Sequence, residues 1–128
     1  MANTEGMEGG CLCGVVRYRV VGKPSFQTNC HCGNCRRATG AQSVAWVTFL
    51  TTEFSIVKGE VAHYHSETQA TWSFCRHCGT TLTYENAQRP NDVDVTVGSL
   101  DDSEAFPPNK DVCGDEKLSW VHGVTPNI

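Results

Sequence analysis

Seven of the eight cysteines in this chain fall into three short clusters, and their spacing constrains the fold more than any other feature. The clusters read Cys11-Leu12-Cys13-Gly14, Cys30-His31-Cys32-Gly33-Asn34-Cys35 and Cys75-Arg76-His77-Cys78-Gly79. In a reducing compartment, cysteines one or two residues apart are far more often metal ligands than disulfide partners. We therefore expect the chain to fold around bound metal.

Two of the clusters can together complete one closed zinc site. A Cys-x-x-Cys-Gly turn curls until both sulfurs reach one ion at about 2.3 Å, and its glycine tolerates the tight backbone that follows. In Cys-x-Cys the sulfurs of a regular strand lie too far apart, so the backbone must kink, which Gly14 permits. We expect a structural zinc on Cys11, Cys13, Cys75 and Cys78, and it would join the first strand to a distant hairpin. The alternative is that these four are simply buried or form disulfides.

The remaining cluster offers three ligands, which is the arrangement of a catalytic zinc with an exchangeable fourth position. We expect Cys30, Cys32 and Cys35 to converge on this second ion, where three thiolates would suit a thiolate substrate and would deprotonate it. Three alternatives stay open. His31 could be a ligand, although it lies between two ligand cysteines; a residue from elsewhere could close the site; or the cluster could hold no stable metal. The candidates from elsewhere are His63, His65, His77 and Cys113.

Short strands are predicted along most of the chain. Residues 15–22 alternate, with Val16, Tyr18 and Val20 on one face. Similar runs rich in β-branched and aromatic residues cover 43–50, 54–59, 60–65, 71–75, 81–85 and 92–100. Helix is expected only as a turn or two, in 34–40 and in 101–106. The predicted fold class is mainly β, made of short antiparallel strands with one or two short helical turns and stapled by zinc.

Length, composition and charge narrow the class of protein. The 128 residues, 39% hydrophobic and 19% charged, predict a disordered tail over 1–8 and a single globular domain over 9–128. No apolar run approaches the length of a membrane span, and the N-terminus lacks a secretory signal, so we expect a cytoplasmic location and no membrane partner. The net charge of −4 argues against nucleic acid as a partner. The oligomeric state stays open.

Several residues outside the ligand set have a role to assign. Arg36 and Arg37 directly follow the last ligand, where they could bind substrate carboxylates or form a solvated face. His63 and His65 are expected as half-exposed packing. The tryptophans are expected in the core or a pocket wall; they are Trp46, Trp72 and Trp120. Cys113 follows no ligand spacing and is expected to be a free small apolar residue.

Taken in this order, the clusters resemble the glutathione-dependent formaldehyde-activating enzyme family, also called the centromere protein V or GFA domain. The resemblance runs from 9–20 through 30–40 and 74–84 to 94–102 and 117–120. It implies a β-tent fold with two zincs, a structural one on Cys11, Cys13, Cys75 and Cys78 and a catalytic-type one on Cys30, Cys32 and Cys35. It also implies carbon–sulfur lyase chemistry that joins glutathione and formaldehyde. Cys113 matches no motif of the family.

Two classes of function follow from these observations. The first is a zinc-dependent lyase that adds a small-molecule thiol, with glutathione the leading choice, to an aldehyde such as formaldehyde. The second is a zinc-stabilised binding or adaptor module without catalytic activity. A third, redox or metal-buffering chemistry, carries less weight. An open three-thiolate site favours the enzyme, because an adaptor has no use for a vacant position.

Overall fold

A computed structural model describes residues 6–124, which form ten strands, one α-helix and three 3₁₀ turns. The strands are β1 (Met7–Gly10), β2 (Arg17–Val20), β3 (Phe26–Cys30), β4 (Val44–Leu50), β5 (Phe54–Lys58), β6 (Val61–His65), β7 (Ala70–Cys75), β8 (Thr81–Asn86), β9 (Asp92–Thr96) and β10 (Lys110–Val112). The helix is α1 (Gly33–Thr39), and the 3₁₀ turns are η1 (Thr51–Glu53), η2 (Val97–Ser99) and η3 (Gly114–Glu116). No helix among these residues is long and apolar enough to cross a membrane.

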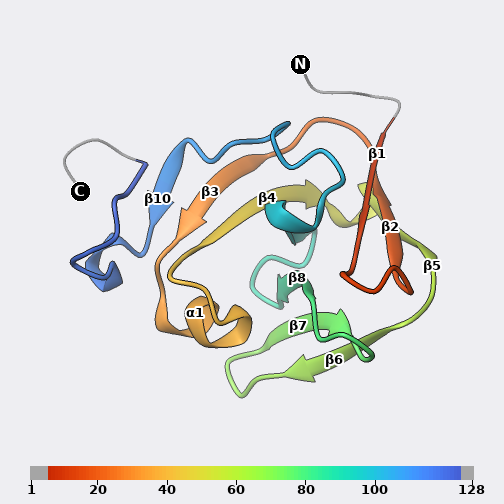
Figure 1. Ribbon diagram of the computed structural model, residues 1–128, viewed down its shortest axis with the longest axis horizontal. Helices are drawn as coiled ribbons and strands as arrows, with labels where there is room; N and C mark the ends of the chain where they lie inside the picture. The colour runs from red at the N-terminus through yellow and green to blue at the C-terminus, as the bar shows by residue number, and fades with distance from the viewer. Residues whose placement is uncertain (1–5, 125–128) are drawn as a thin grey trace.

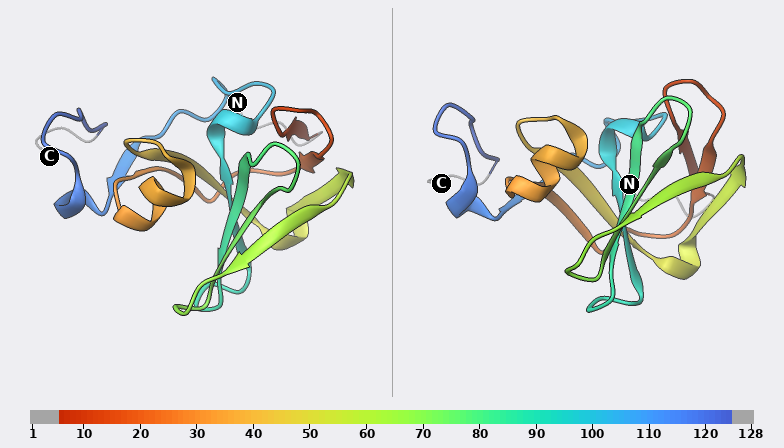
Figure 2. Two further views of the ribbon diagram at one scale, coloured as in Figure 1. Left: turned by 60° about the horizontal axis from the view of Figure 1, so that its bottom comes forward. Right: turned by 90° about the horizontal axis from the view of Figure 1, so that it is seen from below.

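The strands form two sheets and confirm the prediction of a mainly β fold. One sheet has the order β1-β2-β5, and the other has the order β10-β3-β4-β9-β8-β7-β6. Every strand pair is antiparallel except β10 with β3, which run parallel. The β1–β2 hairpin and β10 lie at opposite ends of the molecule (Figures 1 and 2). The two ends carry different cysteine clusters.

The main core lies between the two sheets. Val16, Tyr18 and Val20 are fully or almost fully buried, as their alternation in the sequence predicts, and they pack with apolar residues of β4, β8 and β9. The Tyr18 hydroxyl, buried with its ring, is hydrogen-bonded to Ser99 Oγ at 2.7 Å. This core fixes β2 and therefore the loop that carries the first cysteine pair.

A smaller buried cluster lies beside α1. The rings of Trp46, Trp72 and Tyr84 pack with centroids 4.7 to 6.1 Å apart, against Cys30 and Cys35. Trp46 and Trp72 are thus core residues, which is one of the two positions that we expected for the tryptophans. Trp120 is different, because 66% of its surface is exposed. The second group of cysteines therefore packs against these aromatic rings.

Helix α1 forms where a helical turn was expected, but residues 101–106 form only bends and turns. In that segment the Asp102 carboxylate accepts the backbone N–H of Glu104 at 3.2 Å, which closes a turn without starting a helix. Strand β1 begins at Met7 and pairs with β2, so the sheet starts two residues before the expected domain boundary. Residues 1–5 of the expected tail lie outside the described part of the chain.

Candidate metal sites

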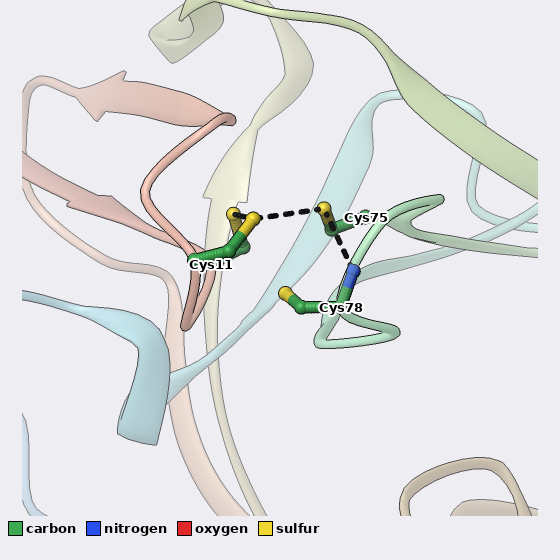
Figure 3. A group of neighbouring side chains, drawn as sticks. Cys11, Cys75 and Cys78 are labelled. Atoms are coloured by element: carbon green, nitrogen blue, oxygen red, sulfur yellow. Dashed lines mark hydrogen bonds between the residues drawn. The ribbon is translucent and has the colours of Figure 1, made fainter.

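The first cysteine cluster joins two hairpins that are far apart in the sequence. The β1–β2 loop carries Cys11 and Cys13, while Cys75 ends β7 and Cys78 lies in the β7–β8 turn. Their four sulfurs all lie within 4.8 Å of one another. Figure 3 shows the Cys11 side chain facing those of Cys75 and Cys78 across the gap between the two loops. The structure therefore brings together all four residues of the expected structural site.

The spacing of these sulfurs fits a tetrahedral ion. Sulfurs at about 2.3 Å from one zinc lie about 3.8 Å from each other when the geometry is tetrahedral. Cys13 Sγ lies 3.6 Å from Cys11 Sγ and 3.8 Å from Cys75 Sγ. A disulfide would need about 2.05 Å between its sulfurs, and all eight cysteines are free. The first cluster thus has the donor set and the dimensions of a four-thiolate zinc site.

Backbone N–H groups and a hydroxyl group form hydrogen bonds with three sulfurs of the first cluster. The backbone N–H of Val16 donates to Cys11 Sγ at 3.2 Å, and that of His77 donates to Cys75 Sγ at 3.3 Å. The hydrogen bond with the Thr80 hydroxyl is the main cause that lowers the pKa of Cys78 to about 5. Gly14 and Gly79 close the two loops at φ +81°, a conformation that side chains rarely adopt. The expected kink at Gly14 is therefore present.

The second cluster lies where β3 leads into α1. Cys30 ends β3, Cys32 is the N-cap of α1, and Cys35 lies on the buried side of the helix. The Cys35 thiol donates to Cys30 Sγ at 3.3 Å, and the Cys35 backbone N–H donates to Cys32 Sγ at 3.2 Å. The three residues that we expected to bind the second ion thus lie together, but the Cys35 sulfur is outside the group of sulfurs whose mutual distances are all within 4.8 Å.

Cys113 also belongs to this cluster, a position that the spacing of the sequence did not predict. It follows β10, and its sulfur forms with those of Cys30 and Cys32 a group in which all distances are within 4.8 Å. We expected a free small apolar residue, but its side chain lies at the ligand cluster and the residue is exposed. The alternative in which Cys113 reaches the second site is the one that the geometry favours.

The histidines considered as ligands lie elsewhere. His63 and His65 are exposed on β6, where their Nδ1 atoms are hydrogen-bonded to Ser73 and Thr71 at 2.8 and 2.9 Å. The His31 imidazole is buried, and its Nε2 lies 2.6 Å from Asp111 Oδ1. Over residues 6–124, both groupings that could hold a metal ion consist of cysteines alone. Such a set of soft sulfur donors suits zinc.

The thiols of the second cluster perturb one another's ionisation. The hydrogen bond from Cys35 is the main cause that lowers the pKa of Cys30 to about 6. The same bond raises the pKa of Cys35 well above its usual range, with burial as the next cause. Partial burial, together with the charges of Cys30 and Cys32, raises the pKa of Cys113 to about 12. The cluster by itself favours one thiolate, so further thiolates need a cation among them.

The two arginines after Cys35 have different surroundings. Arg36 Nη1 donates to the backbone carbonyls of His31 at 2.6 Å and Glu116 at 2.9 Å, so this side chain ties α1 to the loop after Cys113. Arg37 is exposed. Both line a pocket of about 390 Å³, which Leu118 and Trp120 also line. A guanidinium beside an exposed aromatic ring can bind a carboxylate or a peptide-like ligand.

Comparisons with known proteins identify a matching family and several similar proteins. A family model described as "Glutathione-dependent formaldehyde-activating enzyme" matches residues 6–115. An uncharacterized lyase of Schizosaccharomyces pombe is 29% identical over 113 residues, which cover 86% of this chain and 80% of the relative. A putative glutathione-dependent formaldehyde-activating enzyme of Halomonas elongata is 27% identical over 124 residues, covering 90% and 79%. The crystal structure of a Rhodobacter sphaeroides protein matches with a TM-score of 0.65 at 26% identity, covering 80% of this chain and 98% of that one.

Proposed function

We propose a function from one premise: this chain belongs to the glutathione-dependent formaldehyde-activating enzyme family, whose model matches it over residues 6–115. The proposed activity is that of a zinc-dependent carbon–sulfur lyase. Its substrates would be a small-molecule thiol of the glutathione type and an aldehyde such as formaldehyde. In the forward direction the sulfur bonds to the carbonyl carbon, the C=O double bond becomes single, and the thiol proton ends on the oxygen. The reverse reaction breaks the same carbon–sulfur bond.

The observation that carries this proposal is the group of cysteines at the start of α1. We assign the structural zinc to Cys11, Cys13, Cys75 and Cys78, whose sulfurs staple two hairpins. We assign a second, catalytic-type zinc to Cys30, Cys32 and Cys35. When bound there, zinc would supply a positive charge that keeps a sulfur ligand deprotonated at neutral pH. The raised pKa values of Cys35 and Cys113 support a site that needs a cation to hold more than one thiolate.

Residues of the adjoining pocket would position the thiol substrate. Arg37 is exposed, and the exposed Trp120 lines the same pocket. A carboxylate of a glutathione-type thiol could pair with Arg37 while its backbone packs on Trp120. Arg36 would mainly hold the pocket wall, because its Nη1 already binds two backbone carbonyls. Both arginines remain candidate substrate contacts.

The rest of the chain fits a small-molecule substrate. A net charge of −4 supports neither a nucleic-acid backbone nor an anionic membrane surface as partner. A cytoplasmic location belongs to the same proposal, because eight free cysteines are best kept reduced in that compartment. A second candidate function is a zinc-stabilised binding module. The presence of Cys113 beside Cys30 and Cys32 favours it, because a fourth protein sulfur could close the site permanently.

Exchange spectroscopy by NMR tests the lyase directly. The zinc-loaded protein is mixed with glutathione and ¹³C-formaldehyde, and the exchange rate between free formaldehyde and the S-hydroxymethyl adduct is measured. We expect acceleration above the spontaneous rate, and loss of this acceleration in Cys32→Ser at equal folded concentration. A protein that accelerates neither direction with glutathione or smaller thiols would overturn the lyase and favour the binding module.

A further inference from the structure

We propose that Cys113 is the fourth protein ligand of the second metal site, which closes that site as a four-thiolate centre until a substrate thiol displaces it. The inference rests on the proposed second metal and thiol substrate. It goes beyond them by giving a ligand role to a residue outside the three-cysteine pattern. It also reconciles a closed site with an enzyme, because the fourth position is filled by an exchangeable residue.

The distances between the sulfur atoms support Cys113 as a metal ligand. The group whose sulfurs all lie within 4.8 Å of one another contains Cys30, Cys32 and Cys113. The four sulfurs of the first cluster also all lie within 4.8 Å of one another, and their spacing fits a tetrahedral ion. Cys35 Sγ lies 3.3 Å from Cys30 Sγ, but it is not within 4.8 Å of all three sulfurs of Cys30, Cys32 and Cys113. With Cys35, the cluster offers the four soft donors that a closed zinc site uses.

The parallel pairing of β10 with β3 delivers Cys113 to this place. In their register Val112 is opposite Cys30, and the backbone N–H of His31 donates to the Val112 carbonyl at 3.1 Å. The next residue on each strand therefore leaves the sheet at the same point. The buried side-chain contact between His31 Nε2 and Asp111 Oδ1 adds to the backbone hydrogen bonds that hold this register.

The loop after Cys113 is fastened to the helix that carries the other ligands. The backbone N–H of Gly33 donates to Glu116 Oε1 at 3.0 Å, and Arg36 Nη1 donates to the Glu116 carbonyl at 2.9 Å. Cys113 itself adopts a left-handed conformation with φ 55° and ψ 42°. Both sides of Cys113 are thus tied to the β3–α1 connection, and the thiol is held at the cluster from both directions.

Cys113 is also the ligand that an entering thiol can replace. Cys30 and Cys35 are each only 7% exposed and belong to the aromatic core, whereas Cys113 is exposed at the end of an edge strand. A thiol that takes the place of Cys113 would enter as its thiolate, and Cys113 would leave its position as a ligand. The proton of the entering thiol would pass to the Cys113 sulfur, so the charge at the site would be unchanged.

Cobalt substitution tests the ligand role without reference to activity. Sulfur-to-cobalt charge-transfer absorption grows with the number of bound thiolates. The wild-type protein with two cobalt ions should therefore show the absorption of eight thiolate ligands. Cys113→Ser should lose about an eighth of this absorption, all of it from the second site. The matched control is Asp115→Asn, an exposed change in the same loop that should leave the spectrum unaltered. A Cys113→Ser spectrum identical to that of the wild type would overturn the proposal.

A measurement on the unmodified protein covers the case in which Cys113→Ser does not fold. X-ray absorption at the zinc edge should give an average of about four sulfur ligands per zinc in the wild type. An average of about 3.5 sulfur ligands per zinc, with nitrogen or oxygen ligands in the remaining positions, would contradict the proposal. Added glutathione separates this inference from the lyase. In folded Cys113→Ser it should restore the lost absorption. If it does not, the thiol substrate is wrong while the ligand role of Cys113 stands.

Discussion

His31 Nε2 lies 2.6 Å from Asp111 Oδ1, and neither side chain is exposed to solvent. His31 stands between Cys30 and Cys32, and Asp111 is two residues before Cys113, so this one contact links both halves of the second thiol cluster. The other ring nitrogen of His31 is buried without a hydrogen-bond partner in the described residues. The imidazole contacts Asp111 and, at 3.5 Å, Asn29 Nδ2, and it lies outside the groups of side chains that could hold a metal ion in the described residues.

Removal of this contact should weaken the second site selectively. Asp111→Ala leaves the buried imidazole with only the 3.5 Å contact between its Nε2 and Asn29 Nδ2, which we expect to cost about 1–3 kcal/mol in the free energy of unfolding. Urea denaturation measures the loss, and zinc content after dialysis should fall towards one ion per chain. Asp111→Asn keeps an acceptor oxygen and serves as the matched control, with a smaller effect. Equal loss of both ions would show that the contact does not act on the second site in particular.

The two clusters should differ in what they contribute to folding. Cys75→Ser or Cys78→Ser removes a ligand from the site that joins distant hairpins, where structural zinc in finger peptides contributes roughly 10–16 kcal/mol. We expect these variants to unfold by circular dichroism. Cys32→Ser or Cys35→Ser should stay folded and lose one zinc, because the aromatic cluster still supports α1. Similar melting curves for both sets would refute the division into structural and catalytic-type sites.

The two arginines should separate in binding experiments. Arg37→Ala should weaken glutathione binding by up to about fivefold, since an exposed ion pair contributes about 1 kcal/mol at most. Binding of 2-mercaptoethanol, which has no carboxylate, should not change. Arg36→Ala should instead lower thermal stability, because two backbone carbonyls lose a charged donor. Titration calorimetry with both thiols distinguishes the roles, and an Arg37→Ala protein that binds both thiols normally would exclude Arg37 as a substrate contact.

Much of the fold could be predicted from local sequence patterns. The alternation of Val16, Tyr18 and Val20 identifies β2 and its buried face, and the spacing of the cysteines identifies the first cluster. Both signals are local, because each pair of ligands lies within one tight turn. The position of α1 could also be predicted, since the chain must turn between Cys32 and Cys35.

The sequence did not predict the edge of the large sheet, where β10 pairs with β3 and brings Cys113 to the second cluster. Strand β10 has only three residues, too few for an alternating pattern, and β3 is mostly polar with Phe26 exposed. Their parallel pairing joins segments about eighty residues apart, and it depends on register and on a buried histidine–carboxylate contact. None of these has a local sequence signal. The place of Cys113 could therefore only come from the structure.

Cadmium-113 NMR of the substituted protein tests most directly the claim that one site is structural and the other takes the substrate thiol. The cadmium chemical shift reports the number and type of ligands at each ion separately. We predict two resonances of four-sulfur sites, of which added glutathione shifts or broadens only one. The responding resonance should be the one that disappears in Cys32→Ser and remains in Cys78→Ser where that variant retains any fold. Two resonances that both ignore glutathione would contradict the account.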